Sequence, residues 1–266
     1  AYVTADGSLH VAPVVSGTRG GPRLDTDRVV TLADVKDAHH PTWSPDGNWL
    51  AFQRGQEDQD GQIWVVEWDK EKGKFGISQT LGITGTYPAW SPEISSGQKE
   101  GNKQYLAYSM KNHIWICELK KNAQGLPQCQ TPSQLVADCH ATAGPNCADR
   151  YPAWSPDGSR IAFARITDSG SPGINITGIE DQVDIYVCDV QLGQLPVQCT
   201  KPTRLGTAET PGWDCFPTWK DSNTVAWSTY NTNESNFYLS VKSLGNNSTV
   251  TSCQKPVGVE PAWGNN

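Results

Sequence analysis

The sequence lacks the features that mark several common classes of protein. No apolar run approaches the length of a membrane-spanning helix. No cluster of basic residues occurs, and 28 acidic residues against 21 basic ones give a net charge of −7, which disfavours binding to a nucleic-acid backbone. No signal peptide is present. Because Ala1 already reads as the start of a strand, we expect that a leader was removed before this numbering begins.

Two sequence signatures of metal binding and catalysis are also absent. There is no C-x-x-C pair, which argues against structural zinc as the role of the cysteines. There is no G-x-S-x-G motif and no second domain to carry a catalytic triad, which argues against a serine hydrolase. Function therefore has to be sought in what the chain does contain.

A recurring segment organises the chain. Residues 151–158 read YPAWSPDG and lead into an apolar run at 161–163, and residues 40–47 read HPTWSPDG and lead into a similar run at 50–52. Shorter forms of the segment surround Trp90, Trp219 and Trp263. Self-similarity of this kind predicts a stacked or circular repeat fold.

Each repeat predicts a unit of four strands. The proline before Trp fits the start of a strand, Ser-Pro-Asp-Gly fits a tight turn, and the apolar run that follows fits a buried second strand. A third strand is expected at residues 63–66, 114–117, 185–188 and 237–240. A weaker and more polar fourth strand, at the outer edge, is expected near 79–83, 132–136, 202–205 and 256–259.

The segment resembles the TolB-like, or PD40-type, propeller repeat, whose hallmark is the P-x-W-S-P-D-G turn. The copies at Trp43 and Trp154 are nearly complete. The copy at Trp90 has Glu93 and an insertion in place of Asp-Gly, and Trp219 is followed by Lys220 instead of Ser. The resemblance implies an all-β propeller of four-stranded antiparallel blades. It specifies the fold and says little about function.

We predict a single domain, residues 1–266, with five blades. Five units centre on the repeat tryptophans, and the last of them, at Trp263, has room for only one strand. The N-terminus supplies the other three strands, with residues 1–4 as the second, 9–14 as the third and 28–32 as the fourth. The two terminal segments would then share one blade and close the ring without a free sheet edge.

The cysteines and glycosylation sequons indicate secretion. Cys117 and Cys129 fall on the third and fourth strands of one unit, and Cys188 and Cys199 at the matching places in the next. Two further pairs are expected, one across a short loop and one by elimination, namely Cys139–Cys147 and Cys215–Cys253. Sequons begin at Asn175, Asn233, Asn246 and Asn247. We therefore expect a glycosylated, extracellular protein, or a periplasmic one if the source is bacterial.

The residue before each repeat proline is expected to point toward the mouth of the central channel. These ring positions are His40, Tyr87, Tyr151, Phe216 and Glu260, and just outside them lie Arg150, Trp213 and Asp214. Aromatic rings beside a few charged groups suit a sugar or another small polar ligand. The alternative is that these large side chains only fill the channel.

The tryptophans fall into two groups. Those of the repeat are expected to pack blade against blade. Three others are expected outside the buried positions of the repeat, namely Trp49, Trp68 and Trp213. Of these, Trp213 is the candidate for ligand contact.

The resemblance also suggests a metal site. Some TolB-like lyases hold a metal through histidines in the channel, and His40 resembles one of these histidines by position. Among the other ring positions only Glu260 could act as a ligand, and the one further imidazole nearby is His140. A transition-metal site normally needs three or more converging ligands. We therefore expect no metal and no cofactor.

We predict a non-catalytic role, in which the chain binds a protein, a glycan or further copies of itself. A rigid disc with varied loops is a suitable scaffold for presenting a binding surface. The alternative is a carbohydrate-active enzyme or lectin at the channel mouth. Glycoside hydrolysis needs two carboxylates across the scissile bond, and Asp149, Asp214 and Glu260 could converge there. No catalytic residue is assigned.

Overall fold

The computed structural model describes residues 1–16, 22–33, 35–57, 59–95, 102–135, 147–167, 182–193, 196–205, 212–231, 236–245 and 251–252. Within these ranges the chain is built from strands, and the one helical element is the 3-10 turn η1 (Thr26–Arg28). In the part of the chain that is described, no helix has the length and apolar character needed to cross a membrane. The prediction of an all-β fold is confirmed.

Four segments of the chain each form a four-stranded antiparallel unit, as the repeat predicts. The first contains β6 (Ala38–Trp43), β7 (Trp49–Arg54), β8 (Gly61–Asp69) and the first part of β9 (Lys74–Trp90). The second contains the end of β9, β11 (Asn102–Met110), β12 (His113–Lys121) and β13 (Pro127–Gln134), with the short β10 (Ile94–Ser95) paired to β11. The third contains β14 (Cys147–Trp154), β15 (Arg160–Thr167), β16 (Gln182–Gln191) and β17 (Gln198–Arg204). The fourth contains β18 (Gly212–Asp221), β19 (Thr224–Asn231), β20 (Asn236–Ser243) and β21 (Thr251–Ser252).

Strand β9 belongs to two successive units. This sharing of one strand was not predicted from the sequence. It pairs with β8 as far as Gly85, and from Thr86 onward it pairs with β11. The fourth strand expected near 79–83 therefore runs into the next first strand without a break. The outer strands β13 and β17 begin earlier than expected, at Pro127 and Gln198. The strand expected near 256–259 lies outside the described residues.

The N-terminal residues form a smaller sheet in the order β1 (Tyr2–Val3), β2 (Leu9–Val11) and β5 (Val30–Thr31). These are the expected second, third and fourth strands of a further unit. One boundary was wrong: the third strand ends at Val11, because β3 (Val14–Ser16) forms a hairpin of its own with β4 (Pro22–Leu24). The segment around Trp263, predicted to complete this sheet, lies outside the described residues.

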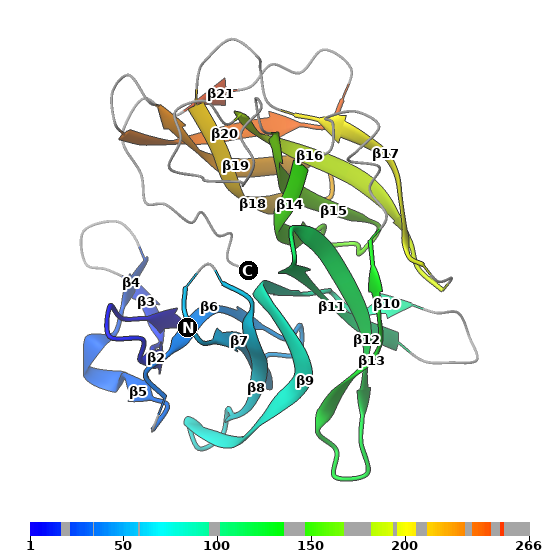
Figure 1. Cartoon of the computed structure of the whole chain (residues 1–266). Helices are drawn as coiled ribbons and strands as arrows, with labels where there is room; N and C mark the ends of the chain where they lie inside the picture. The colour runs from blue at the N-terminus through cyan, green and yellow to red at the C-terminus, as the bar shows by residue number, and fades with distance from the viewer. Residues whose placement is uncertain are drawn as a thin grey trace.

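The units follow one another around a common centre (Figure 1). The N-terminal sheet lies beside β6–β9, which continues into β11–β13, and β14–β21 occupy the other half of the molecule. Apolar side chains fill the spaces between successive units. The cluster that joins the second unit to the third, for example, includes Tyr105, Trp154, Phe163 and Cys188.

The repeat tryptophans also join neighbouring units by a recurring hydrogen bond. The indole N–H of Trp154 donates to the carbonyl of Ala89 at 3.2 Å, and that of Trp219 donates to the carbonyl of Ala153 at 3.0 Å. Trp49 contradicts the expectation that it lies outside the core, since it is only 7% exposed. It opens β7 on the same face as Ala51, and alternate residues of a strand share a face.

The Ser-Pro-Asp-Gly motif forms a self-contained turn. Ser44 Oγ donates to Asp46 Oδ1 at 2.6 Å and accepts from the backbone N–H of Trp49 at 2.9 Å, while Gly47 has a φ of 62°. The second copy repeats these contacts with Ser155, Asp157, Gly158 and Arg160. Burial alone would raise the pKa of Asp157, but hydrogen bonds from Ser155 and Ser159 lower this pKa to about 2. These aspartates therefore hold the turn together.

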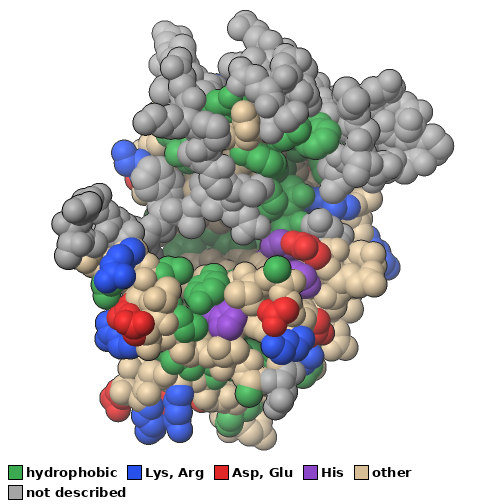
Figure 2. All heavy atoms as spheres, turned by 90° about the vertical axis from the view of Figure 1, so that its left-hand side faces the viewer, with side chains coloured by type: hydrophobic (Ala, Val, Ile, Leu, Met, Phe, Trp, Pro, Cys, Tyr) green, Lys and Arg blue, Asp and Glu red, His purple; other side chains and the backbone are tan. Residues whose placement is uncertain are grey.

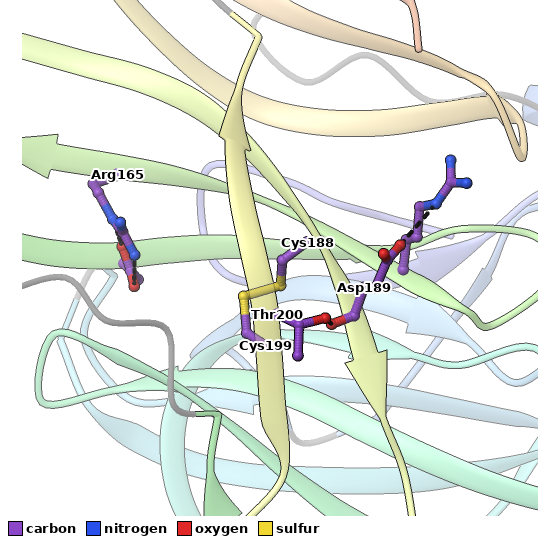
Figure 3. The surroundings of a disulfide bond; sticks show 7 residues. Arg165, Cys188, Asp189, Cys199 and Thr200 are labelled. Carbon is purple, nitrogen blue, oxygen red and sulfur yellow. Dashed lines mark hydrogen bonds and ion pairs between the residues drawn. A yellow bond between two sulfur atoms is a disulfide. The ribbon is translucent and has the colours of Figure 1, made fainter. Parts of the chain in front are cut away.

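Two of the predicted disulfides are present. Cys117–Cys129 joins β12 to β13, so it connects a third strand to its outer neighbour. Cys188–Cys199 joins β16 to β17 in the same way (Figure 3). The other two pairs stay predictions, because Cys139, Cys253 and the side chain of Cys147 lie outside the described residues. The sequon positions Asn175, Asn233, Asn246 and Asn247 also lie outside them.

Candidate functional site

Four of the five predicted ring positions meet at the centre of the molecule. The ring centroids of His40 and Tyr87 are 4.0 Å apart, those of Tyr87 and Tyr151 are 4.3 Å apart, and those of Tyr151 and Phe216 are 4.5 Å apart. The four side chains line a cavity of about 310 Å³, together with the Pro-Ala-Trp or Pro-Thr segments that follow them. We call this the channel-mouth cavity. The fifth position, Glu260, lies outside the described residues.

All four ring residues have a left-handed backbone. Their φ angles are 49° at His40, 53° at Tyr87, 57° at Tyr151 and 53° at Phe216. Such angles are uncommon for bulky side chains and cost about 1–3 kcal/mol each. The pairing between the first and second strands shifts register at this point in every unit, which is the mark of a β-bulge. The bulge turns each ring out of its sheet and toward the centre.

The surface near the N-terminal strands shows where apolar groups reach solvent. Figure 2 shows hydrophobic side chains in a recess between the two halves of the molecule, with histidine side chains at its edge and charged side chains spread over the lower half.

The other predicted contact residues do not line the cavity within the described part of the chain. Arg150 Nη2 donates to Asn112 Oδ1 at 3.1 Å. Trp213 stacks on Tyr230 with a centroid distance of 5.4 Å. Asp214 is buried and accepts a hydrogen bond from Thr229 at 2.7 Å. The structure thus brings together His40, Tyr87, Tyr151 and Phe216, and it places Arg150, Trp213 and Asp214 outside the described lining of the cavity.

Asp149 is engaged in a buried ion pair. Arg165 donates through Nε and Nη2 to its two carboxylate oxygens at 2.8 and 2.9 Å, and the two side chains are 4% and 0% exposed. The guanidinium also lies 4.8 Å from the centroid of the Tyr186 ring. A carboxylate held in this way cannot serve as one of a catalytic pair across a glycosidic bond.

The importance of Arg165 was missed from the sequence, although a signal was present. Asp149 and Asp214 both stand three residues before a repeat proline, and the register places Arg165 and Thr229 opposite them on the second strand. Aligning the second strands of the repeats would have indicated these partners. Among the described residues, no group of three or more His, Cys, Asp or Glu side chains could hold a metal ion.

Comparison with known proteins assigns the fold. No protein-family model matches the sequence, and no curated protein matches it. A protein assigned as TolB from Agrobacterium tumefaciens is 16% identical, with a TM-score of 0.54 over 94% of this chain and 74% of its own. The chain has a TolB-like propeller fold.

Two further structures are similar to this propeller. TolB from Acinetobacter baumannii is 17% identical with a TM-score of 0.48, and the match covers 88% of this chain and 47% of that protein. A puromycin-hydrolysing peptidase from Mycobacterium tuberculosis is 12% identical with a TM-score of 0.43, and the match covers 92% of this chain and 35% of the peptidase. This chain thus spans less than half the length of either protein. Identity at this level identifies a fold and not an activity.

Asp214 makes the stability of the propeller depend on pH. Burial raises the pKa of Asp214 to about 6, from an ordinary value of 3.8. The folded protein therefore holds a proton between pH 4 and pH 6 that the unfolded chain has lost, so this group's contribution to stability falls as pH rises through that interval. At about 1.4 kcal/mol per pH unit, the loss is roughly 3 kcal/mol.

We expect Asp214→Asn to remove this dependence. Urea unfolding at several pH values should show the stability of the variant, relative to the wild-type protein, rising by about 2–3 kcal/mol between pH 4 and pH 7. Asp189→Asn, at a carboxylate that is 68% exposed, measures the effect of losing an ordinary surface acid. A constant difference between Asp214→Asn and wild type across this range would contradict the assignment.

Proposed function

We propose that this chain is a secreted, non-catalytic binding protein that holds its partner at the channel-mouth cavity. The observation that carries this proposal is the convergence of four rings, each on a strained, left-handed residue. Backbone strain of this kind persists only where the surrounding structure enforces it, and it is concentrated at binding and active sites. Four copies at one place favour a binding site over side chains that only fill space.

The chemistry of the cavity suits a glycan or a protein side chain. Its described lining is made of aromatic rings, an imidazole, prolines and small residues, with no carboxylate among them. Aromatic faces bind the apolar face of a sugar or an aromatic or aliphatic side chain, while phenol and imidazole groups offer hydrogen bonds. A volume of about 310 Å³ lies at the small end of ligand sites, so a single sugar residue or side chain would enter it.

The positions of the acidic residues argue against glycoside hydrolysis. Asp149 is neutralised by Arg165, and Asp214 is buried against Thr229. Of the three candidate carboxylates, Glu260 alone is left for the channel mouth. One carboxylate cannot supply both the acid and the base or nucleophile that the reaction needs.

The proposal includes a closed ring of five blades and an extracellular or periplasmic location. Closure is supported by the N-terminal sheet, whose strand β1 lies at the edge, where a strand from the C-terminal segment would pair. Two disulfides support an oxidising compartment. An experimental structure that places Trp263 beside β1 would support closure, whereas placement of Trp263 in the β18–β21 sheet would contradict it.

We expect Tyr151→Ala to weaken partner binding strongly. The ring of Tyr151 contacts both Tyr87 and Phe216, and its loss removes about 1.5–3 kcal/mol of apolar contact, or a tenfold to hundredfold change in affinity. A glycan array, a peptide array and a chromogenic glycoside panel, run with wild type and variant, would identify the partner class.

The matched control is Tyr230→Ala, which removes a half-buried tyrosine that does not line the cavity within the described residues. Binding that falls with Tyr151→Ala and persists with Tyr230→Ala supports the proposal. Binding that is equal in all three proteins would place the partner elsewhere. Hydrolysis of a glycoside by the wild-type protein would contradict the non-catalytic role.

A further inference from the structure

A second cavity lies in the seam between the third and fourth units. It has a volume of about 420 Å³, within the range of small-molecule sites, and no described residue lines both it and the channel-mouth cavity. Strands β15, β16 and β17 contribute to one side, and the end of β20 with Leu244 and Gly245 forms the other. We call this the seam pocket. It is independent of the binding site proposed above.

Three cationic side chains from three different strands line the seam pocket: Arg160 on β15, Arg204 on β17 and Lys242 on β20. Two of them cross the seam. Arg160 Nη1 donates to the carbonyl of Ser222 at 3.2 Å, and Lys242 Nζ donates to the carbonyl of Leu205 at 3.1 Å. These contacts fix the charged groups before any ligand arrives, so little side-chain freedom would be lost on binding.

The three cations retain unused hydrogen-bond donors. A guanidinium has five N–H groups and an ammonium has three. Arg204 Nη2 donates to Asp184 Oδ1 at 2.7 Å, whereas its Nε is buried and has no hydrogen-bond partner among the described residues. Lys242 uses one donor, on a carbonyl oxygen, and forms no ion pair within the described part of the chain. The donors available to a ligand are therefore the remaining N–H groups of Lys242 and of the Arg204 guanidinium, whose side chain is 32% exposed.

The charge balance of the seam pocket is positive although the chain as a whole is acidic. Its described lining has three cations and one carboxylate, Asp189, which pairs with Arg160 at 3.2 Å. Asp184 neutralises Arg204 from outside the lining, so among the described residues the charge of Lys242 has no counter-ion. At physiological salt, charges beyond about 8 Å are largely screened, so this local excess outweighs the net charge of the chain.

The rest of the described lining is mixed, because Thr203 and Ser243 belong to it together with apolar residues. Val187, Leu205 and Leu244 line the pocket, and Cys188 brings the disulfide to its wall. Figure 3 shows Asp189 beside this Cys188–Cys199 bridge. A pocket with cations, hydroxyl-bearing residues and apolar residues suits a ligand that carries a charged group on a small organic body.

We propose that the seam pocket binds a small anionic ligand whose phosphate or sulfate group is held by Arg204 and Lys242. Both groups present several acceptor oxygens, and hydrogen bonds between ionised partners are about twice as strong as neutral ones. The volume leaves room for a body of the size of a monosaccharide next to the anion. The ligand class is therefore a phosphate or sulfate ester of a small molecule.

Isothermal titration calorimetry at low ionic strength tests this proposal. The probes are inorganic phosphate, inorganic sulfate, glucose 6-phosphate and, as the uncharged counterpart, glucose. We expect saturable binding of one anion per chain and none of glucose. Lys242→Gln should weaken binding about tenfold or more, and Lys242→Arg, which keeps the charge, should restore most of it. The comparison between phosphate and sulfate identifies the preferred group.

The matched control is Lys72→Gln, at an exposed lysine paired with Asp69 and remote from the described lining of the pocket. Arg160→Gln is a second variant, in case the loss of Lys242 disturbs the seam. It should also weaken anion binding, because it removes a positive charge from the lining and leaves the carboxylate of Asp189 without its ion-pair partner Arg160. Saturable anion binding that falls with Lys242→Gln or Arg160→Gln and persists with Lys72→Gln supports the site. Absence of saturable binding, or equal affinity in all the variants, overturns it.

Discussion

Asp149→Asn is expected to lower the free energy of unfolding by about 3–5 kcal/mol, the cost of leaving one partner of a buried ion pair uncompensated. Arg165 is fully buried and is held by both oxygens of Asp149. The variant keeps the size of the side chain and removes its charge, so the buried arginine loses the carboxylate that neutralises it within the described part of the chain. Urea unfolding monitored by tryptophan fluorescence measures the change.

Two further variants separate charge from packing at this position. Asp189→Asn breaks the ion pair with Arg160, in which Asp189 is 68% exposed, and should cost less than about 1 kcal/mol. The double variant Asp149→Leu with Arg165→Met replaces both charges with apolar groups and should lose less than Asp149→Asn alone. If Asp149→Asn differs from wild type by under about 1 kcal/mol, the pair is not the buried, isolated contact that its geometry indicates.

The second large effect is expected from the disulfides. Cys188→Ala with Cys199→Ala should reduce the free energy of unfolding by about 3 kcal/mol, because the bridge closes a loop with a sequence separation of 11 residues and restricts the unfolded chain. The equivalent double variant at Cys117 and Cys129, with a separation of 12, should lose a similar amount. Denaturant unfolding of the three proteins under identical conditions checks both values.

The comparison between the two disulfide variants is informative in itself. The bridges occupy matching places in successive units, so the loss should be alike if loop closure dominates. Addition of a thiol reductant should lower the free energy of unfolding of the wild-type protein. The decrease should be smaller in each variant, because one of the two bridges is already absent. A loss below about 1 kcal/mol in both variants would mean that the bridges add little beyond strand packing.

Several features of the fold could be predicted because they are local in sequence. The Ser-Pro-Asp-Gly turn is held by contacts between residues two to five positions apart, such as Ser44 with Asp46 and with Trp49. The pairing of Cys117 with Cys129 follows from two neighbouring strands joined by a short connection. The ring positions follow from the repeat, since the residue before each proline occupies an equivalent place in every unit.

Other features depend on which residue lies opposite which across a sheet or seam. The continuity of β9 and the hairpin of β3 with β4 were not predicted, because strand propensity does not show where pairing passes from one partner to the next. Burial of Trp49 was missed for a related reason: its position in the motif does not reveal the neighbouring unit that covers it.

The sequence by itself determined the repeat, its turn chemistry, two disulfides and the identity of the residues that meet at the centre. Only the tertiary structure decided that Asp149 is neutralised by Arg165, that burial raises the pKa of Asp214, and that three cations from separate strands share one pocket. The physical reason is the sequence separation of the interacting residues. Turns and hairpins form from contacts within a few residues, whereas burial and charge pairing depend on side chains that only the packing of whole units brings together.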